Sequence, residues 1–114
     1  MSFSMTPFEV ASASLAEPAK VHFVRLMPGI ATRHSDTIDI FFRVNGRPAL
    51  VAISCATLSE LDAKESRHFT DQQLVDIAGQ WLHRTLAAGY DATVAELFLG
   101  GADFRSMAKE LGYY

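Results

Sequence analysis

The side chains best equipped for chemistry gather in three places along the chain. Arg33, His34 and Asp36 stand together in a polar stretch, Cys55 is the only cysteine, and His68 precedes a helical pattern. A polar loop beside a sheet is a place where catalytic groups are often found. A thiol at the start of a helix feels the positive end of the helix dipole and becomes more acidic. These five residues are the candidates for an active or ligand-binding site.

Structural explanations compete with each of these candidates. A solvated loop accounts for Arg33, His34 and Asp36 equally well, since no paired base and nucleophile is recognisable there. Cys55 fits the role of a small buried hydrophobic residue, because free cysteine is among the most buried residue types. The segment around it matches no nucleophile motif. We therefore expect no catalytic residues, although an enzyme is not excluded.

Metal and cofactor signatures are absent from the sequence. The four histidines have no Cys, His or carboxylate partner at the local spacings that mark metal sites. Gly100-Gly101 precedes a predicted helix, but neither of the common glycine-rich phosphate-binding patterns surrounds it. We expect no metal site and no cofactor.

Composition restricts the class of protein further. Of the 114 residues, 49% are hydrophobic and only 20% are charged, which favours a folded domain over a disordered chain. The net charge of −3 disfavours nucleic acid and anionic lipid as partners. No secretory signal or membrane-spanning run is present, and a single cysteine asks for no oxidising compartment. The expected location is the cytoplasm.

The segment 37–54 has the pattern of a β-hairpin turning on Asn45-Gly46. Asn-Gly is favoured in a type I′ turn because both central positions require positive φ. A two-residue loop pairs Val44 with Arg47 and places Ile38, Ile40, Phe42, Ala49, Val51 and Ile53 on one apolar face. The opposite face then holds Phe41 across from Leu50.

Two further strands are expected around this hairpin. Residues 20–26 are rich in β-branched and aromatic types, and 93–99 favours a strand over a helical turn. Pro48 sits where its missing N–H would point away from strand 37–44, so no strand should pair beside it. The strand at 20–26 then joins the other side of 37–44, which leaves 47–54 at an edge near Pro48.

Capping patterns predict the helices. Thr57 begins a capping box before a short helix near 58–66, and Thr70 begins another before the strongest helix, 71–88. Asp103 is the expected cap of a helix over 104–111. The arm 1–19 reads either as a short helix over 7–16, begun by a capping box at Thr6-Pro7-Phe8-Glu9, or as an unstructured segment. The rest, 20–114, is expected to form one α+β domain: a small antiparallel sheet of three to four strands with helices packed on one face.

An excess of apolar surface suggests self-association. Apolar residues on the helix 71–88 sweep about half of its circumference, which implies burial on two sides, against a sheet plus another helix or against a second subunit. The outer hairpin pair of Phe41 and Leu50 also needs cover, so these two residues and Trp81 are the expected interface. The leading hypothesis is a non-enzymatic binding or interaction module that forms a homodimer. The alternative is a small enzyme or ligand-binding protein that uses the 33–36 loop, Cys55 or His68.

An ordered series of motifs resembles a known family. Phe-Arg-Val-Asn-Gly-Arg-Pro at 42–48, Ala-Ile-Ser at 52–54, two helices, and Glu-Leu-Phe-Leu running on to Asp103-Phe104 are similar to a family of small bacterial domains of unknown function. Its members carry a Cys-x-Ile-Ser segment after the hairpin turn, whereas this chain reads Val-Ala-Ile-Ser with its cysteine at 55. The resemblance implies the fold and no catalytic residues.

Overall fold

The computed structural model describes residues 5, 7–11, 17–28, 37–66, 68–90 and 97–113. Three of the predicted site residues, Arg33, His34 and Asp36, lie outside these ranges. In chain order the elements are β1 (Phe8–Val10), β2 (Ala19–Pro28), β3 (Thr37–Val44), β4 (Arg47–Ser54), α1 (Cys55–Glu65), α2 (Asp71–Ala87), β5 (Leu97–Leu99) and α3 (Gly101–Glu110).

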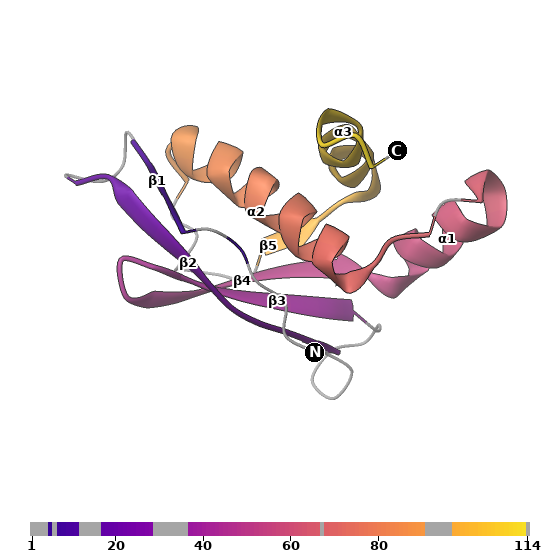
Figure 1. The fold of residues 1–114 in the computed structure, drawn as a ribbon, viewed down its shortest axis with the longest axis horizontal. Coiled ribbons are helices and arrows are strands. Elements are labelled where there is room, and N and C mark those ends of the chain that lie inside the picture. Colours follow the sequence, from indigo (N-terminus) through magenta and orange to yellow (C-terminus); the bar gives the residue numbers. More distant parts are fainter. Residues whose placement is uncertain are drawn as a thin grey trace.

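The fold is α+β, with a mixed sheet on one side and the helices on the other. Within the described residues the sheet has five strands in the order β1-β2-β3-β4-β5. Helices α2 and α3 lie on one side of it, and α1 extends beyond the end of β4 toward that same side (Figure 1). The expectation of three to four antiparallel strands is corrected in two details, because β1 is added and β5 pairs with β4 in parallel. A parallel pair needs a crossover connection, and the chain supplies one through α1 and α2.

The predicted hairpin is confirmed residue by residue. β3 and β4 pair in the expected register, from Thr37 opposite Ser54 to Val44 opposite Arg47. Asn45 and Gly46 have φ of 52° and 81°, as a type I′ turn requires. The turn is also tied to β2, since the backbone N–H of Lys20 donates a 2.8 Å hydrogen bond to Oδ1 of Asn45.

The N-terminal helix predicted over 7–16 is wrong at Phe8–Val10, and residues 12–16 lie outside the described part of the chain. Phe8–Val10 is strand β1, which pairs antiparallel with β2 so that Phe8 faces Val21. Short isolated helices are marginal in water, whereas the free edge of β2 offers backbone partners and a site where Val10 is buried. Tertiary pairing therefore overrides the local capping pattern.

The edge predicted near Pro48 is confirmed, and a further strand pairs with β4 only farther along it. β5 pairs with β4 only at Val51–Ile53, so the described strands leave the side of β4 beside Pro48 unpaired. The predicted strand 20–26 lengthens to Ala19–Pro28 and joins β3 as expected, with an irregularity between Phe23 and Arg25. A β-bulge of this kind adds one residue to a strand and locally increases its twist.

Helix α2 forms the centre of the core, as its pattern predicted. Its N-terminus carries the expected capping box, in which Gln73 N–H donates to Thr70 Oγ1 and Thr70 N–H donates to Gln73 Oε1. Its wide apolar arc is covered by the sheet on one side and by α3 on another, which matches the first of the two predicted alternatives. Gly89 follows the helix with φ of 95°, the conformation expected of a C-terminal cap.

The two shorter helices begin earlier than their capping patterns indicated. Ser54, not Thr57, is the N-cap of α1, because its hydroxyl accepts a hydrogen bond from Ala56 N–H. Asp103 lies in the first turn of α3, whose N-cap is Gly100. Both helices follow directly on a strand, so the end of the sheet decides where the helix begins.

Candidate functional site

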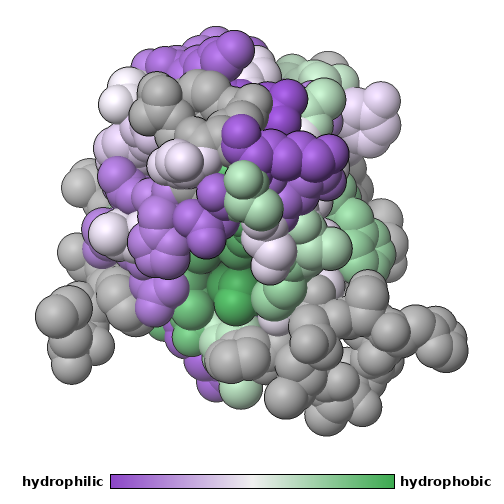
Figure 2. Space-filling model, turned by 90° about the vertical axis from the view of Figure 1, so that its right-hand side faces the viewer, coloured by the Kyte–Doolittle hydropathy of each residue, from purple (hydrophilic) through white to green (hydrophobic). Residues whose placement is uncertain are grey.

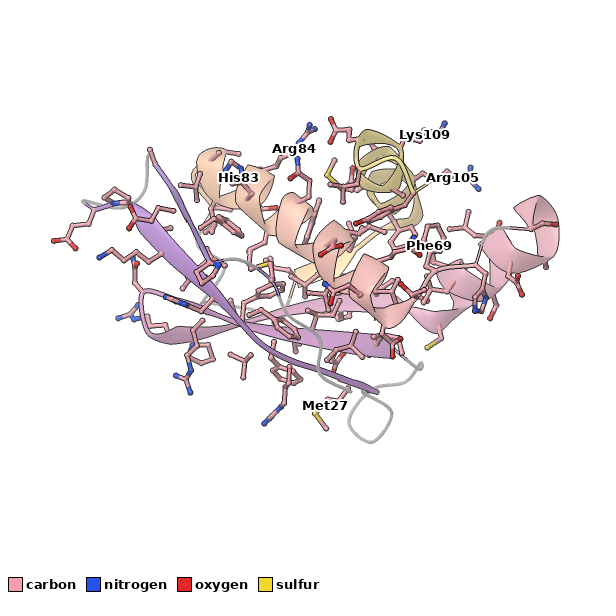
Figure 3. All side chains as sticks on the ribbon, in the orientation of Figure 1. Met27, Phe69, His83, Arg84, Arg105 and Lys109 are labelled. Carbon is pink, nitrogen blue, oxygen red and sulfur yellow. The ribbon has the colours of Figure 1, made fainter. Side chains whose placement is uncertain are left out.

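Strand register defines the outer face of the sheet, the face opposite the helices. Strand neighbours that lie side by side share a face, and the register places two rows on this one. The first row runs across four strands and the second across three: Met27, Asp39, Ala52 and Phe98, then Arg25, Phe41 and Leu50. Met27 extends away from the helices in Figure 3. We call these seven residues the outer face.

The outer face is largely apolar, and part of it is exposed. Phe98 is 61% exposed and Met27 is 42% exposed, whereas Phe41 and Leu50 are half-buried and lie directly opposite each other. The Arg25 guanidinium lies over the ring of Phe41, 4.9 Å from its centroid, where the ring face attracts a cation. Large apolar side chains are therefore exposed at both ends of the first row, whereas Asp39 and Ala52 between them are buried.

The acidic residue in the outer face is not available to a ligand. Asp39 is 5% exposed, and its carboxylate accepts a 2.7 Å hydrogen bond from the Thr37 hydroxyl. A next row across β2, β3 and β4 contains His22, Arg43 and Pro48, all exposed. On the side toward the hairpin turn, the two apolar rows therefore adjoin a row that carries the polar side chains of His22 and Arg43.

Only two of the three predicted interface residues come together. Phe41 and Leu50 adjoin on the outer face, but Trp81 belongs to α2, on the other side of the sheet, where it packs against the core. Met27 and Phe98 were missed as surface residues. The signal for Phe98 was present in the alternation of Leu97, Phe98 and Leu99, once that segment is taken as a strand with one buried face.

A hollow of about 310 Å³ opens at the opposite end of the sheet from the hairpin turn, between α1 and the start of α2. Figure 2 views this side and shows hydrophobic surface near its centre, with hydrophilic residues to the left of it and above it. Its apolar lining residues come from one strand, two helices and the segment between them: Ile38, Leu58, Phe69 and Leu74. Its polar lining residues are Ser59, Asp62, His68 and Asp71.

Of the two predicted site residues that the structure describes, Cys55 and His68, only His68 lines this hollow. It is exposed, and it shares the rim with the carboxylates of Asp62 and Asp71. Within the described residues, no group of three or more His, Cys, Asp or Glu side chains is arranged to hold a metal ion. The rim is therefore an acidic, hydrogen-bonding border around an apolar floor.

Cys55 is not part of the hollow. It is the first residue of α1 and is half-buried, so the prediction that it stands where a helix begins is confirmed. It does not line any of the described hollows. Cys55 and His68, two separate candidates in the alternative hypothesis, thus do not share a described cavity.

A second hollow of about 330 Å³ lies between the N-terminal strand, α2 and the C-terminal segment. Phe8 packs against the His83 ring at its border, with 5.3 Å between ring centroids. Tyr113 closes another border by donating a hydrogen bond to Asp76. These contacts join the N-terminal strand and the C-terminal segment to α2, and they give His83, Asp76 and Tyr113 structural roles.

Three comparisons with known proteins found no relative of this chain. No protein-family model matches the chain, no curated protein sequence matches it, and no solved structure matches it. The resemblance to small bacterial domains of unknown function stays a prediction. Among the described helices, none is both long and apolar enough to cross a membrane.

Proposed function

We propose that this protein is a non-enzymatic interaction module that forms a homodimer through the outer face of its sheet. The observation that carries the proposal is the exposed pair of Met27 and Phe98, which lie at the two ends of one cross-strand row. Large apolar side chains exposed together on one surface commonly mark a site of protein association. Helices α2 and α3 lie on the other side of the sheet and α1 extends toward that side, so none of the described helices covers this row (Figure 1).

A second copy of the chain suits this face for a reason of charge. In a twofold dimer the same patch of each subunit meets the other, so like charges at the centre of the patch would repel each other. The row from Met27 to Phe98 has no exposed charge, because its one carboxylate, that of Asp39, is buried. The exposed cations Arg25 and Arg43 lie in the next two rows toward the hairpin turn, and an antiparallel arrangement of two sheets would hold the two copies of each apart.

Sedimentation across a wide concentration range tests the proposal. We expect the wild-type chain to populate a dimer as concentration rises, and we expect Phe98→Asp and Met27→Asp to remain monomeric. Tyr90→Asp is the matched control, since Tyr90 is 67% exposed but lies after α2, away from the outer face. Circular dichroism would verify that each variant folds. A wild-type monomer at all concentrations, or a monomeric Tyr90→Asp, would refute the proposed dimer.

A further inference from the structure

The hollow between α1 and α2 has a preformed apolar floor. Leu74 is buried, and Ile38, Leu58 and Phe69 pack partly buried against the core beside it. Phe69 precedes the Thr70 cap and Leu74 lies in the first helical turn, the two positions that form a hydrophobic staple. The start of α2 thus holds two of the four floor residues in place, and Ile38 of β3 and Leu58 of α1 supply the other two.

Two further contacts hold Phe69, a residue of this floor, in a fixed position. The Phe69 ring meets Phe104 of α3 edge to face, with 5.0 Å between centroids and 88° between planes. The reciprocal hydrogen bonds of the Thr70–Gln73 capping box fix the backbone that carries Phe69. A site held in this way loses little conformational entropy when a ligand enters.

The rim of the hollow is negatively charged. Asp62 projects from α1 and Asp71 from the first turn of α2, and both are exposed. Neither side-chain carboxylate forms a hydrogen bond or an ion pair within the described part of the chain. The described lining residues include no Lys or Arg. An occupant that is apolar along its length and cationic at its end would match both the floor and the rim.

We propose that this hollow receives an arginine side chain presented by a basic segment of a protein partner. Its volume of about 310 Å³ lies at the lower end of the range for small-molecule pockets, which suits one long side chain. The arginine stem can cover apolar surface while its guanidinium stays at the rim. The planar guanidinium binds carboxylates through paired hydrogen bonds, which a lysine ammonium cannot reproduce. This proposal does not depend on the proposed dimer, which would use the outer face of the sheet.

Nuclear magnetic resonance titration of the full chain with two short peptides tests the proposal. The probes are acetylated and amidated Gly-Ser-Xaa-Ser-Gly peptides in which Xaa is arginine or its neutral isostere citrulline. We expect the arginine peptide to shift backbone amide signals of residues 58–62 and 68–74 saturably, and the citrulline peptide to bind at least fivefold more weakly. Equal binding of the two peptides, or arginine-dependent shifts confined to other parts of the chain, would overturn the proposal.

Charge-neutral variants provide the second arm of the test. We expect Asp62→Asn and Asp71→Asn each to weaken the arginine peptide by about two- to fivefold, the range for a partly solvated charge pair. Asp103→Asn is the matched control, because Asp103 also lies in the first turn of a helix and does not line the hollow. Each variant must keep the dispersed spectrum of the folded chain. If Asp103→Asn weakens binding as much as Asp71→Asn, the attraction is general electrostatics and the assigned site is wrong.

Discussion

The hydroxyl of Tyr113 donates a 2.6 Å hydrogen bond to Oδ2 of Asp76, a residue 37 positions earlier in the middle of α2. Oδ1 of the same carboxylate accepts a 3.0 Å hydrogen bond from the side-chain Nε2 of Gln72. A second link between α2 and the C-terminal region is the ion pair of Arg84 with Glu110. The C-terminal segment is therefore fastened to the central helix by polar contacts as well as by packing.

Removing the Tyr113 hydroxyl should loosen this attachment. We expect Tyr113→Phe to lower the free energy of unfolding by about 1 kcal/mol, since a hydrogen bond to a charged acceptor is lost at a half-buried site. Tyr90→Phe is the control, because Tyr90 is exposed and should change stability by less than about 0.5 kcal/mol. Denaturant unfolding at neutral pH measures both. Equal stability of wild type and Tyr113→Phe would contradict a stabilising role for this bond.

Alkaline pH should weaken the same attachment. The hydrogen bond to Asp76 raises the pKa of Tyr113 above its ordinary value of 10.0, and burial and the Asp76 charge act in the same direction. A folded-state pKa above the unfolded value means that the stabilisation is complete below pH 10.0 and is lost as pH rises through the folded pKa.

The stability difference between wild type and Tyr113→Phe should therefore shrink as pH rises above Tyr113's ordinary pKa. Unfolding curves of the two proteins from about pH 9 to about pH 11 would measure this change. A difference that stays constant over this interval would show that ionisation of Tyr113 is not coupled to folding.

Two phenylalanines near the C-terminus should respond differently to the same truncation. Phe104 is fully buried in the core and Phe98 is 61% exposed on the outer face. We expect Phe104→Ala to cost about 3–5 kcal/mol and Phe98→Ala less than about 1 kcal/mol. Thermal or denaturant unfolding at low protein concentration, where association does not contribute, measures the difference. Similar costs at the two positions would contradict the placement of Phe98 outside the core.

The hairpin turn should be sensitive to backbone conformation alone. A Cβ added at Gly46 would meet no atom within 4 Å, but the φ of +81° there disfavours any L side chain. We expect Gly46→Ala to cost about 1 kcal/mol. Gly101→Ala is the control. Gly101 belongs to helix α3, where alanine is favoured, and a Cβ there would make only an ordinary 3.7 Å contact with Thr57. Unfolding curves should therefore separate the two variants, and equal losses would indicate that the turn is not under conformational constraint.

Local chemistry was sufficient to predict the parts of the fold that depend on neighbours in sequence. The Asn45-Gly46 turn, the register it imposes, and the Thr70–Gln73 capping box involve residues at most a few positions apart, or paired by a two-residue loop. The pattern at Thr6-Pro7-Phe8-Glu9 misled because a capping box states only a local preference. Phe8–Val10 instead pairs with β2, a tertiary contact between separate segments of the chain, and this pairing outweighs the local preference.

The candidate sites could be predicted only in part. The opposition of Phe41 and Leu50 followed from alternation in the hairpin, and His68 was named from its residue type alone. The hollow needs Ile38 of β3 beside Leu58 and Leu74 of two different helices, a juxtaposition that no local spacing encodes. For the same reason, the acidic rim was not foreseen.

The sequence by itself determined that the chain forms an α+β domain around one hairpin and one long helix, because turn chemistry, capping and alternation act over a few residues. Only the tertiary structure decided that β5 returns parallel to β4 and that α3 covers the second side of α2. It also placed Met27 and Phe98 on one outer face and formed the hollow between α1 and the start of α2. These relationships arise because segments distant in sequence bury apolar surface against each other. The free energy of this burial depends on which surfaces meet in the fold, and local sequence patterns do not encode it.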